Sequence, residues 1–219
     1  MNRLPAAAAL VTLLAGLIAA ASSQAASPTF TPRAVVPNVA AGDPAPTPVP
    51  TPTPRPYEGP VAALRIPAAG VDDRFPVETR DTTYIAGRET FEDPTAPQYI
   101  AWYPRFGRPG FPGANSLFAA HIDYIGFGPG PFARLTSVAP GASLEVVMDN
   151  GIVYQYTVQS VEVVHLAALD MNAVVFPFVP GDRERITLIS CGGTFVPRPG
   201  GGGEYDSRVI LVAERAIPR

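Results

Sequence analysis

The sequence predicts an all-β domain, and three observations support that expectation. Short apolar or β-branched runs recur along most of the chain and are separated by glycine and proline. Leu144, Val146 and Met148 alternate with polar residues, and the alternation resumes after Asn150-Gly151, which is typical of a β-hairpin. Helical periodicity is confined to brief stretches. Many short strands at this spacing favour a closed barrel or a sandwich over a βαβ fold.

The individual elements follow from the same patterns. We expect strands at residues 61–66, 71–77, 115–121, 144–148, 152–158, 161–164, 186–190 and 208–213. Short helical segments are expected at 131–137 and 166–174. The four glycines at 200–203 lack the lysine and hydroxyl residue of a phosphate-binding loop, so they predict only a flexible connection.

Residues 1–26 form an apolar segment that predicts export. Arg3 precedes an almost uninterrupted apolar run over residues 4–21, and the small residues Ser23-Gln24-Ala25 follow it. These features fit either a cleaved signal peptide or a retained signal anchor in the membrane. In both cases the positive charge at the N-terminal end predicts that the rest of the chain lies outside the cell, anchored at the membrane or secreted to the cell wall.

Residues 27–60 form a Pro/Thr-rich linker, in which every second residue from Pro46 to Pro56 is proline. Such a segment cannot build a core, and its prolines favour extended polyproline II. At about 3.1 Å per residue it spans tens of ångströms, which fits a semi-rigid stalk or a disordered spacer. Residues 61–219 then form one domain of about 160 residues, which is enough for a single core.

Composition excludes several classes of function. The formal net charge is −3 and the sequence contains two histidines and one cysteine. The absence of a basic excess argues against nucleic acid as a partner. One cysteine and two histidines do not make a zinc site, so we expect no metal and no cofactor. We also expect a monomer.

The single cysteine, Cys191, ends the apolar run 186–190 and is followed by Gly192-Gly193. This pattern predicts a buried strand with the thiol at its C-terminal end. One interpretation is a small core residue, because most free cysteines are buried. Exported proteins usually pair their cysteines, however, and a lone one has no partner in the chain, which favours a reactive thiol or an intermolecular bond.

Two further residues complete a candidate catalytic set. His121 follows the apolar run 116–120, and Arg208 begins the apolar run 209–213. A thiol becomes a catalytic nucleophile when a histidine takes its proton or stabilises its thiolate, and a fixed cation can stabilise an oxyanion. Asp123 is either a residue that orients His121 or a solvated carboxylate, and we assign no chemistry to His165.

The segments around these three residues carry recognisable motifs. Thr187-Leu188-Ile189-Ser190-Cys191 resembles the TLxTC signature of sortases, the cysteine transpeptidases of bacterial surfaces. Ala120-His121-Ile122-Asp123 resembles the histidine segment of that family, and Tyr205-Asp206-Ser207-Arg208-Val209 resembles its arginine segment. Two positions depart from the family pattern, because Ala120 stands where glycine is common and Ser190 where threonine is common.

Further stretches are most similar to class E and F sortases, namely Ala101-Trp102-Tyr103 with residues 109–115 after it, and residues 191–195. The resemblance covers residues 60 to 215 and implies a closed eight-stranded β-barrel with a few short helices. It implies Cys191 as nucleophile, His121 as general acid/base, and Arg208 as the stabiliser of the oxyanion or the substrate.

The resemblance also implies a substrate. In the family, an LPxTG-like sorting signal of another exported protein is cleaved between Thr and Gly through a thioacyl intermediate. An amine of the cell wall or of a pilin then resolves the intermediate, or water does so slowly. The loop 166–183 faces the sorting signal in the family, so we expect it to influence specificity.

Two alternatives remain open from the sequence. An L,D-transpeptidase would also use a cysteine, but its cysteine sits in a Ser-x-Gly-Cys-x-Arg setting that differs from Ile189-Ser190-Cys191-Gly192-Gly193. The second alternative is a non-catalytic, stalked β-domain that binds cell-wall components, with Cys191 inert in its core.

Overall fold

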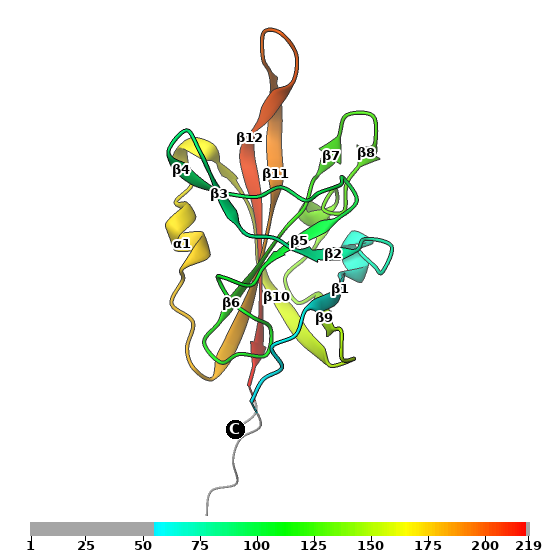
Figure 1. Cartoon of the computed structure of the whole chain (residues 1–219), viewed down its shortest axis with the longest axis vertical. Helices are drawn as coiled ribbons and strands as arrows, with labels where there is room; N and C mark the ends of the chain where they lie inside the picture. Colours follow the sequence, from blue (N-terminus) through cyan, green and yellow to red (C-terminus); the bar gives the residue numbers. More distant parts are fainter. Residues whose placement is uncertain (1–54, 218–219) are drawn as a thin grey trace, which may run out of the picture. The chain divides into compact units, whose positions relative to one another are not determined.

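The structure is a computed structural model that describes residues 55–217 (Figure 1). The predicted N-terminal apolar segment, 1–26, and residues 27–54 of the predicted linker lie outside the described residues. Among the helices within residues 55–217, none combines the length and the apolar character that crossing a membrane requires.

One eight-stranded sheet forms the domain. Its strands are β1 (Val61–Arg65), β2 (Val77–Thr79), β5 (Ile100–Tyr103), β6 (Asn115–Ala119), β9 (Ser143–Met148), β10 (Val153–His165), β11 (Arg183–Pro197) and β12 (Gly203–Ala216). The order across the sheet is β1-β9-β10-β12-β11-β6-β5-β2, with parallel pairing between β6 and β11 and between β2 and β5. The edge strands β1 and β2 lie beside each other, so the sheet curls into a nearly closed barrel (Figure 1). The predicted eight-stranded, mainly β barrel is confirmed.

The alternation of side chains along each strand separates the barrel interior from its outer face. On β12, Val209, Leu211 and Ala213 are buried in the core, and the residues between them face the other way. Outside the barrel, a second apolar cluster covers β5 and β6 and is closed by Val175 from the helix α1 (Met171–Val175). The outer face of these strands is therefore partly covered by the segment that precedes β11.

The predicted hairpin around Asn150-Gly151 is confirmed, and it joins β9 to β10. The backbone nitrogen of Gly151 donates to the carbonyl of Met148 at 3.0 Å, and Gly151 has φ of 86°, a left-handed conformation that glycine adopts readily. The backbone nitrogen of Met148 also donates to the carbonyl of Ile152 at 2.8 Å, so the turn itself is the three-residue loop 149–151, with glycine at its last position. The two strands predicted at 152–158 and 161–164 form one strand, β10, with a bulge between Val158 and Ser160.

The predicted strand over 71–77 is wrong over most of its length. β2 begins only at Val77, and Val71 makes a single isolated bridge. Between them the backbone nitrogen of Arg74 donates to Asp72 Oδ1 at 3.0 Å, which is the pattern of an Asx turn. The turn ends the extended conformation because the side chain of Asp72 bonds to its own local backbone.

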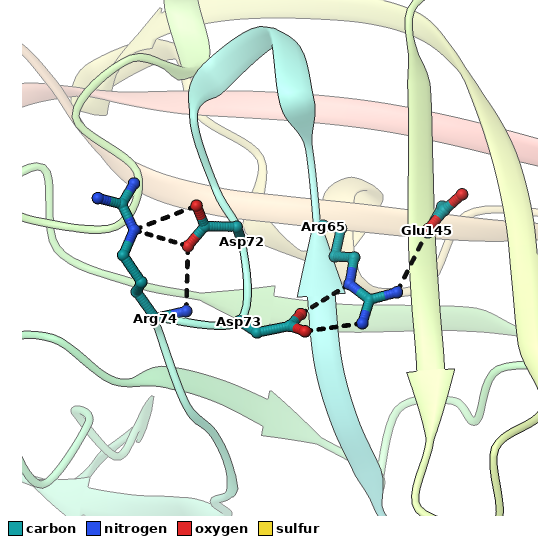
Figure 2. A network of polar contacts seen from close by, with 5 residues as sticks. All are labelled: Arg65, Asp72, Asp73, Arg74 and Glu145. Carbon is teal, nitrogen blue, oxygen red and sulfur yellow. Dashed lines mark hydrogen bonds and ion pairs between the residues drawn. The ribbon is translucent and has the colours of Figure 1, made fainter.

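Charged side chains hold this turn beside the barrel wall (Figure 2). Arg65 on β1 donates to Asp73 from Nε at 2.6 Å, and its Nη1 lies 3.7 Å from Glu145 on β9. The side chains of these residues are partly exposed, so water and salt screen each pair and its contribution to stability is small. Their effect is to fix the position of the loop next to β1.

The predicted helical segments are shorter than expected. Residues 131–137 contain only the 3₁₀ turn η2 (Leu135–Ser137), and residues 166–174 contain the 3₁₀ turn η3 (Leu166–Ala168) followed by α1. Asp170 caps α1 by accepting from the backbone nitrogens of Asn172 and Ala173. The remaining elements, which the sequence patterns did not predict, are the sheet strand β5, the 3₁₀ turn η1 (Pro67–Ala69), the hairpin of β3 (Thr82–Ile85) and β4 (Arg88–Phe91), and the small hairpin of β7 (Asp123–Tyr124) and β8 (Gly128–Pro129).

Candidate active site

Three neighbouring strands position Cys191, His121 and Arg208. Cys191 lies on β11 directly opposite Arg208 on β12, in the antiparallel register of these two strands. On its other side β11 pairs with β6, which ends at Ala119, two residues before His121. The hydroxyl of Ser190 donates to the carbonyl oxygen of Ala120 at 2.8 Å. The residues that precede the thiol and the imidazole are therefore bonded to each other.

Cys191, His121 and Arg208 line one open cleft of about 810 Å³. The structure therefore brings together the three residues that the sequence singled out. Three hairpins and the loop after β4 supply the other lining residues, which are acidic, basic and apolar: Ile85, Asp93, Ile122, Asp123, Tyr124, Ile125, Phe195, Arg198, Gly203, Glu204 and Tyr205. Within residues 55–217, no group of three His, Cys, Asp or Glu side chains is placed to hold a metal ion.

The structure corrects the prediction that Cys191 ends its strand. β11 continues to Pro197, and β12 begins at Gly203, so the two strands project beyond the barrel as a hairpin (Figure 1). Gly193-Thr194 forms a bulge in this ladder, because the register shifts between Gly192 and Phe195 and Gly193 has φ of 79°. The thiol therefore stands in the wall of the cleft, at the point where the hairpin leaves the barrel.

The environment of Cys191 favours the neutral thiol. Burial raises the pKa of the Cys191 thiol above its ordinary value, and the nearby carboxylates of Asp93, Glu204 and Asp123 raise it further. The guanidinium of Arg208 acts in the opposite direction and lowers this pKa. Because the net direction is upward, the free protein carries Cys191 mainly as the thiol at neutral pH.

This balance predicts the pH dependence of alkylation. The rate at which iodoacetamide modifies Cys191 should keep rising as the pH increases beyond 9, because only the thiolate reacts and its pKa is raised. In Arg208→Ala the same profile should shift to still higher pH, since the guanidinium that lowers the pKa of Cys191 is removed. Arg134→Ala, at an exposed arginine that does not line the cleft, is the matched control. A rate that already reaches its plateau near pH 7 would contradict this prediction.

Arg208 is held by acceptors on its own strand. Its Nη1 donates to the carbonyl oxygens of Ser207 at 3.0 Å and Tyr205 at 3.3 Å, and its Nη2 donates to Glu204 Oε1 at 3.2 Å. Glu204 also pairs with Arg198 at 2.5 Å. A guanidinium carries five N–H donors, so these three bonds leave two for a bound substrate.

The segment that carries His121 folds back on itself. The carbonyl oxygen of His121 accepts from the backbone nitrogen of Phe132 at 3.1 Å. A side chain at Gly130 would place its Cβ 2.3 Å from the same oxygen, so this close approach requires glycine. The imidazole packs edge-on against the ring of Tyr124, with 5.2 Å between ring centroids.

The sequence left two roles open for Asp123, and among the described residues it makes no hydrogen bond to His121; it is an exposed carboxylate that bonds to a different residue. Its Oδ2 accepts from the hydroxyl of Tyr205 at 2.5 Å, and this bond raises the pKa of Tyr205 to about 12. This contact was not predictable from the sequence, because the two residues are 82 positions apart. His165 lines a different, smaller pocket, and its Nδ1 accepts from the backbone nitrogen of Ala167 at 3.2 Å, where it caps η3.

Comparison with known proteins adds an independent result. The family model for the Sortase domain matches residues 64–216 of the chain. No curated protein sequence matches it. Among solved structures, sortase C-1 from Streptococcus pneumoniae is similar with a TM-score of 0.50 and 19% identity, over 72% of this chain and 67% of that one. The complex of Streptococcus agalactiae sortase C1 and MTSET matches with a TM-score of 0.50 and 14% identity, over 75% and 73% of the two chains. At these identities the structures report on the fold, and the likeness to classes E and F stays a prediction.

Proposed function

The chain belongs to the sortase family, and from that premise we propose that it is a cysteine transpeptidase acting on an LPxTG-like sorting signal of exported proteins. The observation that supports this proposal best is the single cleft lined by Cys191, His121 and Arg208. These side chains supply the three components of acyl transfer, namely a nucleophile, a proton carrier and a cation for the oxyanion.

In the proposed first half-reaction, the sulfur of Cys191 attacks the carbonyl carbon of the threonine in the Thr–Gly bond. The raised pKa means that the thiol holds its proton before attack, so His121 accepts that proton as a general base. The two remaining N–H donors of Arg208 stabilise the negative charge that develops on the carbonyl oxygen. When the C–N bond breaks, His121 returns the proton to the leaving glycine amine, and a thioester to Cys191 remains.

In the second half-reaction an amine of a cell-wall peptide or a pilin attacks the thioester carbonyl. His121 takes a proton from the attacking amine, and when the C–S bond breaks it returns that proton to the departing sulfur, which leaves as the thiol of Cys191. Arg208 stabilises the second oxyanion as it did the first. Water in place of the amine gives slow hydrolysis. Export through the apolar segment 1–26 fits such substrates, because sorting signals and wall amines are found on the outer side of the membrane.

The loop before β11 is the proposed specificity element. Its helix α1 is held to the barrel by Asn115, whose side-chain nitrogen donates to the carbonyl oxygens of Val174 and Val175, both at 3.1 Å. A pocket of about 360 Å³ between this helix and β4 is lined partly by apolar side chains, including Phe91, Phe106, Met171, Val175 and Phe176. Such a pocket fits an apolar side chain of the sorting signal.

The test is cleavage of a library of fluorogenic LPxTG-type peptides, with and without an oligoglycine acceptor. We expect cleavage at the Thr–Gly bond, formation of the ligated product when the acceptor is present, and a thioester adduct on Cys191 in intact-mass spectra of acid-quenched protein. Hydroxylamine should release the adduct, because it attacks thioesters. A protein that cleaves no member of the library and forms no adduct would instead support a non-catalytic domain that binds wall components.

A further inference from the structure

The proposed transpeptidase needs His121 held beside Cys191, and β6 does not extend far enough to do this. The paired register of β6 and β11 ends at Ala119 and Ile189. The next bond, from the nitrogen of Ala120 to the carbonyl of Ile189, is already long at 3.4 Å. From His121 onward, the backbone bonds of the segment 121–130 run within the segment or to the residues directly after it.

The segment 121–130 has little burial of its own. Its hairpin pairs only β7 with β8, two residues on each strand. The side chains at its tip are exposed, with Ile125 at 84% and Tyr124 at 50%. A hairpin of this size with few buried side chains is marginally stable alone and opens readily. The segment therefore needs an external contact to keep a fixed position.

We infer that Tyr205 and Asp123 provide that contact, as a positioning clamp for His121. Asp123 lies two residues after His121, and Tyr205 lies three residues before Arg208. Within residues 55–217, their hydrogen bond of 2.5 Å is the one side-chain hydrogen bond that joins the segment 121–130 to the β11–β12 hairpin. It links the element that carries the imidazole to the strand pair that carries the sulfur and the guanidinium. Neither residue takes part in bond making or breaking.

Tyr205 is itself held in place by the hairpin. It pairs with Phe195 across the two strands, and their rings pack edge to face with 5.3 Å between centroids. The ring of Phe195 lies so close to Gly203 that a Cβ there would be 2.4 Å from it. The hydroxyl of Tyr205 therefore projects from a packed ring, which suits a residue that fixes the position of another segment.

The first test is Tyr205→Phe, which removes one hydroxyl and keeps the packed ring. We expect kcat for peptide cleavage to fall roughly tenfold while KM stays within about twofold, because the imidazole is displaced while the substrate still binds. The melting temperature should change by no more than about 2 °C, since the lost bond is exposed. Tyr84→Phe, which removes an exposed hydroxyl from a tyrosine outside the cleft, is the matched control and should keep the wild-type kcat.

Substitutions at Asp123 separate the hydrogen bond from the charge. Asp123→Asn retains an oxygen that accepts from Tyr205, so it should keep most of the wild-type kcat. Asp123→Ala has no such oxygen, and its kcat should fall as far as that of Tyr205→Phe. The double variant Tyr205→Phe/Asp123→Ala should be no slower than either single variant, because both remove the same bond. The rates are compared at the pH optimum of each variant, because loss of the Asp123 charge also lowers the pKa of the Cys191 thiol.

A second readout does not depend on turnover. The full-length chain has two histidines, so the ring signals of His121 in a ¹H–¹³C NMR spectrum are assigned by comparison with His165→Gln. In Tyr205→Phe and Asp123→Ala the His121 signals should shift or broaden, and in Asp123→Asn they should stay near the wild-type position.

Unchanged kcat and unchanged His121 signals in Tyr205→Phe would overturn the clamp. An equal loss of kcat in Asp123→Asn and Asp123→Ala, with a matching fall in melting temperature, would also overturn the clamp. Asp123 would then have a purely structural role. A wild-type protein without peptide cleavage would refute the proposed function, and the His121 signals would still decide the clamp.

Discussion

Cys191→Ala is expected to lower kcat/KM for peptide cleavage by about 10⁴-fold or more, because no other thiol in the chain can form the acyl intermediate. The thioester adduct should disappear from intact-mass spectra at the same time. The variant should keep its fold, since Cys191 is only half-buried and loses a single sulfur atom. Its melting temperature and its affinity for the peptide should therefore remain close to those of the wild type.

Cys191→Ser is the matched comparison for this prediction. It keeps the shape of the side chain but replaces the thiol with a hydroxyl, which is a far weaker nucleophile at the same position. Turnover should again be lost, although serine fills the same space. If Cys191→Ala cleaves the peptide at the wild-type rate, the sulfur is not the nucleophile and the proposed reaction is wrong.

Arg208→Ala should lower kcat/KM by roughly 10²- to 10³-fold, the range found when one oxyanion donor is removed. Most of the effect should lie in kcat, because the charge on the oxygen develops only in the transition state. The fold should tolerate the change, because the pair with the half-exposed Glu204 contributes at most about 1 kcal/mol. Steady-state kinetics with the library's best peptide measures the loss of catalysis, and thermal melting shows whether the fold is affected.

Arg208→Lys sharpens the same prediction. A lysine keeps the positive charge, but its single nitrogen cannot bond to Ser207, Tyr205 and Glu204 and still present two donors to the substrate. We therefore expect activity between the wild type and Arg208→Ala. Arg134→Ala, at an exposed arginine outside the cleft, should show wild-type kinetics. Wild-type kinetics in Arg208→Ala would exclude Arg208 from the reaction.

Features that depend on neighbouring residues in the chain were predictable from the sequence. The hairpin at Asn150-Gly151 was recognised because alternation on both sides and the turn residues are all local. The strands that carry Cys191 and Arg208 were recognised from their apolar runs. The strand expected at 71–77 failed because Asp72 and Arg74 form a local turn that apolar spacing does not report.

Features that depend on distant contacts or on exposed strands were not predictable. The hairpin of β3 and β4 was missed because Tyr84 and Ile85 are 72% and 65% exposed, so its residues do not alternate between a buried and a polar face. The extension of β11 past Cys191 was missed because Gly192-Gly193 is typical of a chain break as well as of a bulge. The bond between Tyr205 and Asp123 joins two segments that only the closed barrel brings together.

The projecting β11–β12 hairpin has a practical consequence for protein engineering. The ladder between the strands is regular up to the pairs of Cys191 with Arg208 and Gly192 with Ser207, and the irregularity follows only after them. Changes in length at the glycine tip, residues 200–202, are therefore separated from Cys191 and Arg208 by several cross-strand pairs, whereas Arg198 and Gly203 on either side of the tip line the cleft. An exposed glycine-rich tip is also where insertions are best tolerated. An affinity tag or a fluorophore-bearing peptide inserted at Gly201 would report on the cleft without entering the barrel.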